Sequence, residues 1–183
     1  MQIEALAIPD VKLITPRRFS DARGFFSETF NESAWEKAGF AERFVQDNHA
    51  YSVEKGVVRG LHFQLPPAAQ GKLVRVTRGS ILDVAVDIRR ESPAFGRHVS
   101  AVISAENWCQ IWVPAGFAHG YVTLEPHTEV IYKVTSLYAP GLDRGIRWND
   151  PALAIDWGVS EDAAILSDKD RNQPLFSEAP ALF

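Results

Sequence analysis

Apolar and polar residues alternate along most of this chain. Val84, Val86 and Ile88 alternate with Ala85 and Asp87, a period of two that is typical of a strand with one buried face. The helical period of 3.6 residues is rare by comparison. The chain is therefore predicted to fold mainly into β-strands.

Similar segments recur throughout the chain, separated by glycine, proline and polar residues. The predicted strands are 3–14, 25–30, 73–78, 81–88, 99–103, 108–113, 121–124 and 129–138. Gly79-Ser80 joins two of them and indicates a hairpin turn, and 105–107 indicates another turn. Short strands at such spacing predict an antiparallel sandwich or barrel.

Helical signals are confined to two short segments. The sequence at 33–36 (SAWE) has the form of a capping box, and Gly39 would end that helix. A second short helix is predicted at 160–166. Because no linker, internal repeat or low-complexity tract interrupts the chain, we expect a single domain over 1–183, with N-terminal strands and a short C-terminal tail at 174–183.

The charge balance restricts the kind of partner. The chain has 183 residues, with 19 Lys and Arg against 23 Asp and Glu, and a formal net charge of −4. Proteins that bind nucleic acid usually carry a basic face, so nucleic acid is not expected as a partner. A small anionic ligand held by a few cations is compatible with this balance.

The cysteine content and the hydropathy of the chain indicate the cellular compartment in which the protein is expected. The single cysteine, Cys109, excludes an internal disulfide. The first residues, 1–4, lack the basic start and apolar run of a signal peptide. The longest stretch free of Asp, Glu, Lys and Arg, 107–124, contains proline, histidine and amide side chains and would span a membrane poorly. We therefore expect a cytoplasmic protein without membrane association.

Two motifs resemble the paired motifs of the cupin barrel, a jelly-roll fold. They are 59–64 (RGLHFQ), followed by Lys72 and Gly79, and 114–120 (PAGFAHG). In metal-binding cupins the first motif carries a second histidine and a carboxylate, where this chain has Gln64 and Lys72. A protonated lysine offers no lone pair and repels a divalent cation. We therefore expect a cupin-type jelly roll with no metal and no cofactor.

A narrower resemblance covers nearly the whole chain in order. The segments that carry it are 20–28 (SDARGFFSE), 45–49 (VQDNH), 59–64, 70–76 (QGKLVRV), 116–120, 148–150 (WND) and 166–170 (LSDKD), with Tyr132-Lys133 and Tyr138. Together they resemble the dTDP-4-dehydrorhamnose 3,5-epimerase family. The resemblance implies epimerisation at C3 and C5 of a thymidine-diphosphate 4-keto-6-deoxyhexose through enolates, and typically a homodimer.

The resemblance implies four catalytic residues. His62 would be the base, Asp170 its carboxylate partner, Lys72 the cation that stabilises the O4 oxyanion, and Tyr132 the acid on the opposite face. Imidazole suits a base because its ordinary pKa lies near neutrality, and a phenol suits an acid because it keeps its proton at pH 7. A base is needed to form an enolate, a cation to stabilise its charge, and a proton donor to reprotonate the carbon.

The resemblance also implies a set of substrate-binding residues. They are Arg23, Phe26, Glu28, Gln46, Asn48, Arg59, His119, Tyr138, Asp143 and Lys169. Guanidinium groups match phosphate oxygens, and Tyr138 would stack on the nucleotide. Asp143 stands near a position where the family often has Glu. In a homodimer, Arg23 and Glu28 are expected to reach the neighbouring subunit's site.

Three alternatives stay open. A single-carbon epimerase of a related nucleotide 4-keto sugar would use almost the same residues, so product stereochemistry distinguishes it. A non-catalytic sugar-nucleotide-binding cupin is disfavoured because binding alone needs no base and acid such as His62 and Tyr132. A metal-dependent cupin oxygenase is disfavoured by Gln64 and Lys72.

Overall fold

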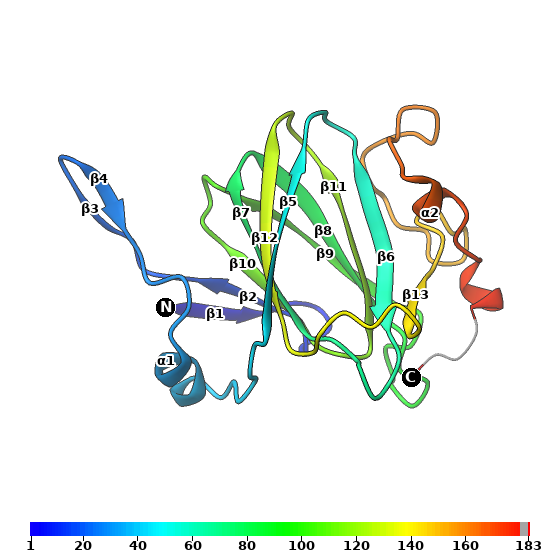
Figure 1. The fold of residues 1–183 in the computed structure, drawn as a ribbon, viewed down its shortest axis with the longest axis horizontal. Helices are drawn as coiled ribbons and strands as arrows, with labels where there is room; N and C mark the ends of the chain where they lie inside the picture. Colours follow the sequence, from blue (N-terminus) through cyan, green and yellow to red (C-terminus); the bar gives the residue numbers. More distant parts are fainter. Residues whose placement is uncertain (180–182) are drawn as a thin grey trace.

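The computed structural model describes residues 1–179 and 183, and in it two antiparallel sheets pack face to face (Figure 1). The six-stranded sheet has the order β1 (Gln2–Ala5), β2 (Lys12–Thr15), β10 (Gln110–Val113), β7 (Lys72–Arg78), β12 (Thr128–Val134), β5 (Gln46–Ser52). The five-stranded sheet has the order β13 (Asp143–Gly145), β6 (Val58–Gln64), β11 (Phe117–Thr123), β8 (Ser80–Asp87), β9 (His98–Ser104). The predicted all-β, jelly-roll class is confirmed.

Gly79 connects the two sheets and does not close a hairpin. β7 pairs with β10 and β12, whereas β8 pairs with β9 and β11, so the hairpin prediction was wrong. The backbone at Gly79 has a φ of +76°, and a Cβ there would lie 2.4 Å from Thr128 Oγ1. Glycine is required because the chain turns sharply against β12, a long-range contact that the local sequence does not reveal.

Several predicted strand boundaries change. The segment 3–14 divides into β1 and β2, which pair with each other. The segment 25–30 contributes only β4 (Gly24–Phe26), which pairs with β3 (Phe19–Asp21) in a separate hairpin. Figure 1 shows this hairpin as an arm that projects away from the sandwich. The sequence pattern missed β3, β5, β6 and β13.

The first helix begins earlier than predicted. In α1 (Glu32–Lys37) the N-cap is Asn31, whose side chain accepts a hydrogen bond from the Ala34 N–H at 3.1 Å. Ser33 therefore lies inside the helix and is not its N-cap, because the Asn31 side chain already accepts from the Ala34 N–H of the first turn. Trp35 is buried against the outer face of the six-stranded sheet, beside Trp112.

The second predicted helix, at 160–166, was wrong. Ala163 and Ala164 donate to the Ser160 carbonyl in a turn, and Ile165 then bridges to Val57 as an extended residue. This bridge ends the turn before it can become a helix. The helix that does form is α2 (Asp168–Arg171), which is capped by the Ser167 side chain.

Besides the cluster around Trp35, apolar side chains fill two larger regions. One core lies between the sheets and includes Val74, Ile111 and Tyr121. The other covers the outer face of the five-stranded sheet beneath the C-terminal segment, which includes Trp148 and Trp157. Within the part of the chain that the structure describes, no helix has the length and apolarity needed to cross a membrane.

The predicted C-terminal tail packs against the sandwich. It contains the short 3₁₀ helix η1 (Phe176–Glu178), and the Phe183 ring lies 6.5 Å from the Phe63 ring, centroid to centroid. The part of this segment at 180–182 lies outside the described residues.

Candidate active site

Polar side chains from both sheets line a cavity with two lobes. The Tyr138 lobe has a volume of about 340 Å³ and also contains Gln46, Asn48, Gln64, Gln70 and Asp143. The His119 lobe has a volume of about 270 Å³ and also contains Ala50, Arg59, Tyr121, Ser167 and Asp170. His62, Lys72, Tyr132 and Lys169 line both lobes. The two lobes therefore form one continuous site.

A larger cavity, of about 500 Å³, lies elsewhere, along the segments 7–10 and 89–97. None of the predicted site residues lines it. Its guanidinium from Arg89 is already paired with Asp87 and Asp10. The two-lobed cavity is therefore the candidate active site, because the titratable groups converge there.

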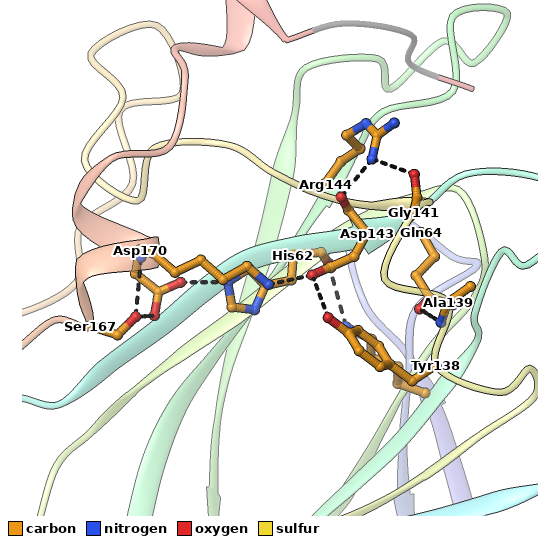
Figure 2. A network of polar contacts seen from close by, with 11 residues as sticks. His62, Gln64, Tyr138, Ala139, Gly141, Asp143, Arg144, Ser167 and Asp170 are labelled. Atoms are coloured by element: carbon orange, nitrogen blue, oxygen red, sulfur yellow. Dashed lines mark hydrogen bonds and ion pairs between the residues drawn. The ribbon is translucent and has the colours of Figure 1, made fainter.

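His62 and Asp170 form a hydrogen-bonded pair. His62 Nε2 lies 2.5 Å from Asp170 Oδ1, and Ser167 Oγ donates to Asp170 Oδ2 at 2.8 Å (Figure 2). Burial alone would raise the pKa of Asp170, but hydrogen bonds from His62, Ser167 and the Gly60 N–H outweigh it and hold the pKa below its usual value. A carboxylate only accepts, so Nε2 carries the proton and Nδ1 keeps a lone pair.

Lys72 places a positive charge beside His62. It begins β7, and its Nζ lies 3.4 Å from the His62 carbonyl oxygen. Burial lowers the pKa of Lys72 to about 8, while the carboxylates of Asp83 and Asp143 act in the opposite direction. A partly desolvated ammonium interacts more strongly with a developing oxyanion than a hydrated one.

Tyr132 faces His62 from the other sheet. It lies on β12, where its register partners are Asn48 on β5 and Val74 on β7. Burial raises the pKa of Tyr132, with Arg59 opposing the shift, so the phenol keeps its proton at neutral pH. Because His62 lies on β6 of the opposite sheet, an imidazole and a phenol flank the cavity from two sides.

The Tyr138 lobe has a polar wall and an exposed ring. Tyr138 Oη donates to Asp143 Oδ2 at 3.3 Å, and Lys169 Nζ contacts the same carboxylate. The Gln46 side chain accepts from the Tyr138 N–H at 3.2 Å and donates to Asn48 Oδ1 at 2.8 Å. An exposed aromatic ring beside a cation suits a nucleotide base and its phosphates.

Gln64 has a role that the sequence did not reveal. Its amide donates to the carbonyls of Ala68 and Leu137. It also accepts from the Ala139 N–H at 2.8 Å (Figure 2). The position where metal-binding cupins have a ligand is thus used to hold the backbone on both sides of Tyr138. The bonds to Leu137 and Ala139 hold the backbone from which the Tyr138 ring projects, and the bond to Ala68 ties it to the loop before β7.

A second histidine–carboxylate pair lies in the His119 lobe. His119 Nε2 lies 2.9 Å from Asp83 Oδ2 and 3.0 Å from Oδ1, and both side chains are buried. Sequence reasoning missed Asp83. The available signal was a charged residue at an inward position of β8, between the core residues Ile81 and Ala85.

Comparison with known proteins agrees with this geometry. A family profile described as dTDP-4-dehydrorhamnose 3,5-epimerase matches residues 5–178. The chain belongs to this epimerase family. A curated member from Pseudomonas aeruginosa is 54% identical over 180 residues, which cover 98% of each chain.

Solved structures of the epimerase family share the fold. One from Bacillus anthracis, with TDP and PPi bound, has a TM-score of 0.92 and 49% identity, covering 95% of this chain and 98% of that one. One from Legionella pneumophila, in complex with dTDP-4-keto-L-rhamnose, has a TM-score of 0.92 and 44% identity, covering 97% and 93%.

The structure brings most of the predicted epimerase site together and leaves one group apart. Arg23, Phe26 and Glu28 lie on or just after the β3–β4 arm, and none lines the two-lobed cavity. Arg23 is exposed and pairs with Asp21 at 2.6 Å. The other predicted catalytic and binding residues all line the cavity.

Proposed function

We propose that this protein inverts C3 and C5 of dTDP-4-dehydro-6-deoxy-D-glucose to give dTDP-4-dehydro-L-rhamnose, a step of dTDP-L-rhamnose biosynthesis. The observation that carries the proposal is the placement of His62 and Tyr132 on opposing sheets across one cavity, with Lys72 beside them. Inversion at carbon requires removal of a proton from one face and delivery of a proton to the other.

Each inversion follows the same proton path. His62 takes the proton from C3 or C5, and the bonding electrons move onto O4 of the adjacent ketone. Lys72 stabilises the charge on O4, and the Asp170 carboxylate stabilises the imidazolium. Tyr132 then delivers its proton to the opposite face of the carbon. Solvent restores the proton on Tyr132 and takes the one on His62, so the reaction consumes no cofactor.

The reaction product separates this function from its alternatives. The test is incubation with the 4-keto nucleotide sugar and assignment of configuration at C3 and C5 by NMR. Inversion at both carbons supports the proposal. Inversion at only one carbon would favour a single-carbon epimerase, and binding without turnover would favour a non-catalytic sugar-nucleotide-binding cupin.

We also propose that the protein is cytoplasmic. Cys109 is a free cysteine, which fits a reducing compartment.

The rate is expected to fall in alkaline solution because Lys72 loses its charge. The ammonium is the active form, and its pKa is about 8, so kcat/KM should decline as pH rises above that value, by about tenfold for each further unit. The measurement is a kcat/KM profile from about pH 6 to 10, with Lys72→Met in parallel. The variant should be slow and lack the alkaline decline. A wild-type profile that stays flat up to pH 10 would contradict the role of Lys72.

We also propose that the protein is a homodimer in which the β3–β4 arm enters the partner's cavity. The arm projects from the sandwich (Figure 1). The rings of Phe19, Phe25 and Phe26 are exposed, and Arg23 does not line its own cavity. Large exposed apolar side chains on a projecting hairpin favour burial against another chain. The partner's arm would supply Arg23 to the substrate diphosphate.

Mixed dimers test the arm's direction. Arg23→Ala protein and His62→Ala protein are each expected to be weakly active or inactive as homodimers. A purified heterodimer should regain activity, because one cavity then combines an intact His62 with the partner's intact Arg23. If the arm served its own chain, no cavity of the heterodimer would be complete, and activity would stay at the level of the parent variants. Size-exclusion chromatography with light scattering measures the oligomeric state.

A further inference from the structure

Tyr121 has a buried hydroxyl that the reaction scheme above does not use. The residue lies on β11, its side chain is 5% exposed, and its ring packs in the core between the sheets. It also lines the His119 lobe. Within residues 1–179 and 183, its Oη is the only fully buried side-chain polar atom without a hydrogen-bond partner.

Tyr121 lies close to charged and titratable groups of the proposed active site. Its register partners are Arg59 on β6 and Asp83 on β8. Burial raises the pKa of Tyr121 well above its usual value, Arg59 opposes the shift, and Tyr132, Asp83 and Asp170 add to it. Both the proposed acid and the partner of the proposed base therefore act electrostatically on this hydroxyl. Its proton stays in place throughout the working pH range, so it serves as a donor.

The nearby groups leave this donor available. Asp170 accepts from His62 and Ser167, and Asp83 faces His119. A buried donor without an acceptor costs stability, and native proteins keep few of them. A hexose in the His119 lobe would offer the missing acceptor through its ring substituents.

We propose that Tyr121 is a further substrate-contacting residue, whose hydroxyl donates a hydrogen bond to an oxygen of the hexose bound in the His119 lobe. The inference rests on the proposed function, because it takes the ligand of that lobe to be the 4-keto sugar. It adds a source of specificity: a site that buries a donor for a sugar oxygen disfavours a sugar that lacks this oxygen.

The test compares Tyr121→Phe with wild type and with Tyr51→Phe. The chain has 4 tyrosines, and Tyr51 is the one outside the cavity, with an exposed side chain whose hydroxyl contacts His127. Tyr121→Phe is expected to have an unchanged or higher Tm, because an unpartnered buried hydroxyl is removed. Its kcat/KM should fall by about ten- to hundredfold. Its affinity for dTDP alone should be unchanged, because the nucleotide would lie in the Tyr138 lobe. Tyr51→Phe should match wild type in all three measurements.

Three results would overturn the inference. They are full kcat/KM in Tyr121→Phe, a lowered Tm that accompanies the loss, and a loss of dTDP affinity equal to the loss of kcat/KM. Inactive wild-type protein would instead remove the proposed function, and this inference with it. If Tyr121→Phe does not fold, a crystal structure of wild type with an unreactive dTDP-hexose decides. Oη within about 3.2 Å of a sugar oxygen supports the contact, and a separation above about 3.5 Å from every sugar oxygen contradicts it.

Discussion

The His62→Ala variant is expected to lose epimerisation at both C3 and C5, with kcat lowered by about 10²–10⁴-fold. In the proposed proton path His62 is the base. Its Nε2 lies 2.5 Å from the Asp170 carboxylate, which leaves Nδ1 to take a proton. Both carbons flank the same ketone, so one base can serve both after a shift of the ring. The measurement is steady-state turnover of the 4-keto nucleotide sugar, together with solvent deuterium exchange at each carbon.

A matched control separates this effect from the loss of a histidine in general. His49 has a half-exposed side chain and contacts Glu129 outside the two-lobed cavity. His49→Ala should keep wild-type turnover. If His62→Ala retained exchange at one carbon, that step would need another base. The proposed proton path would then be wrong for that carbon.

The Tyr132→Phe variant is expected to separate proton exchange from inversion. His62 remains able to remove a proton and, without the phenol opposite, returns one to the same face. Exchange should therefore persist at a reduced rate, while formation of the C5-inverted product falls by about 10²–10⁴-fold. NMR of the product formed in heavy water reports both quantities at once.

The control for Tyr132→Phe is again Tyr51→Phe, which removes a phenolic oxygen outside the cavity. Full inversion by Tyr132→Phe would show that another group delivers the proton. Loss of exchange together with inversion would show that the Tyr132 hydroxyl is needed before the proton is removed. Either result would contradict the assignment of Tyr132 as the acid.

The fold was predictable where inward residues are apolar. The alternating pattern correctly located the strands that became β7, β8, β9 and β12. It failed for β5 and β6, whose inward positions carry Gln46, Asn48, Arg59 and His62. Polar residues that line the cavity take the place of apolar ones on the inner face of these strands. The alternating pattern that predicts a strand is therefore lost where the site lies.

The site was predictable only as far as a motif resemblance reached. That resemblance identified His62, Lys72 and Tyr132 as site residues, and the structure places them in one cavity. It did not indicate the contacts of Asp83 or Gln64. These contacts join residues 36 and 75 positions apart in the chain. Local pattern carries no information about such pairs, because they depend on which strands become neighbours and on how the loops pack against them. The arm's proposed place in a partner subunit is likewise a property of two chains.

Solvent deuterium exchange in the wild-type protein shows whether both inversions pass through an enolate. The protein is incubated with the 4-keto-6-deoxyhexose nucleotide in heavy water, and deuterium at each carbon is followed by NMR. Incorporation is expected at both C3 and C5, because each inversion passes through an enolate that takes its new proton from a group in exchange with solvent. Folded protein that incorporates deuterium at neither carbon would contradict the proposed proton path.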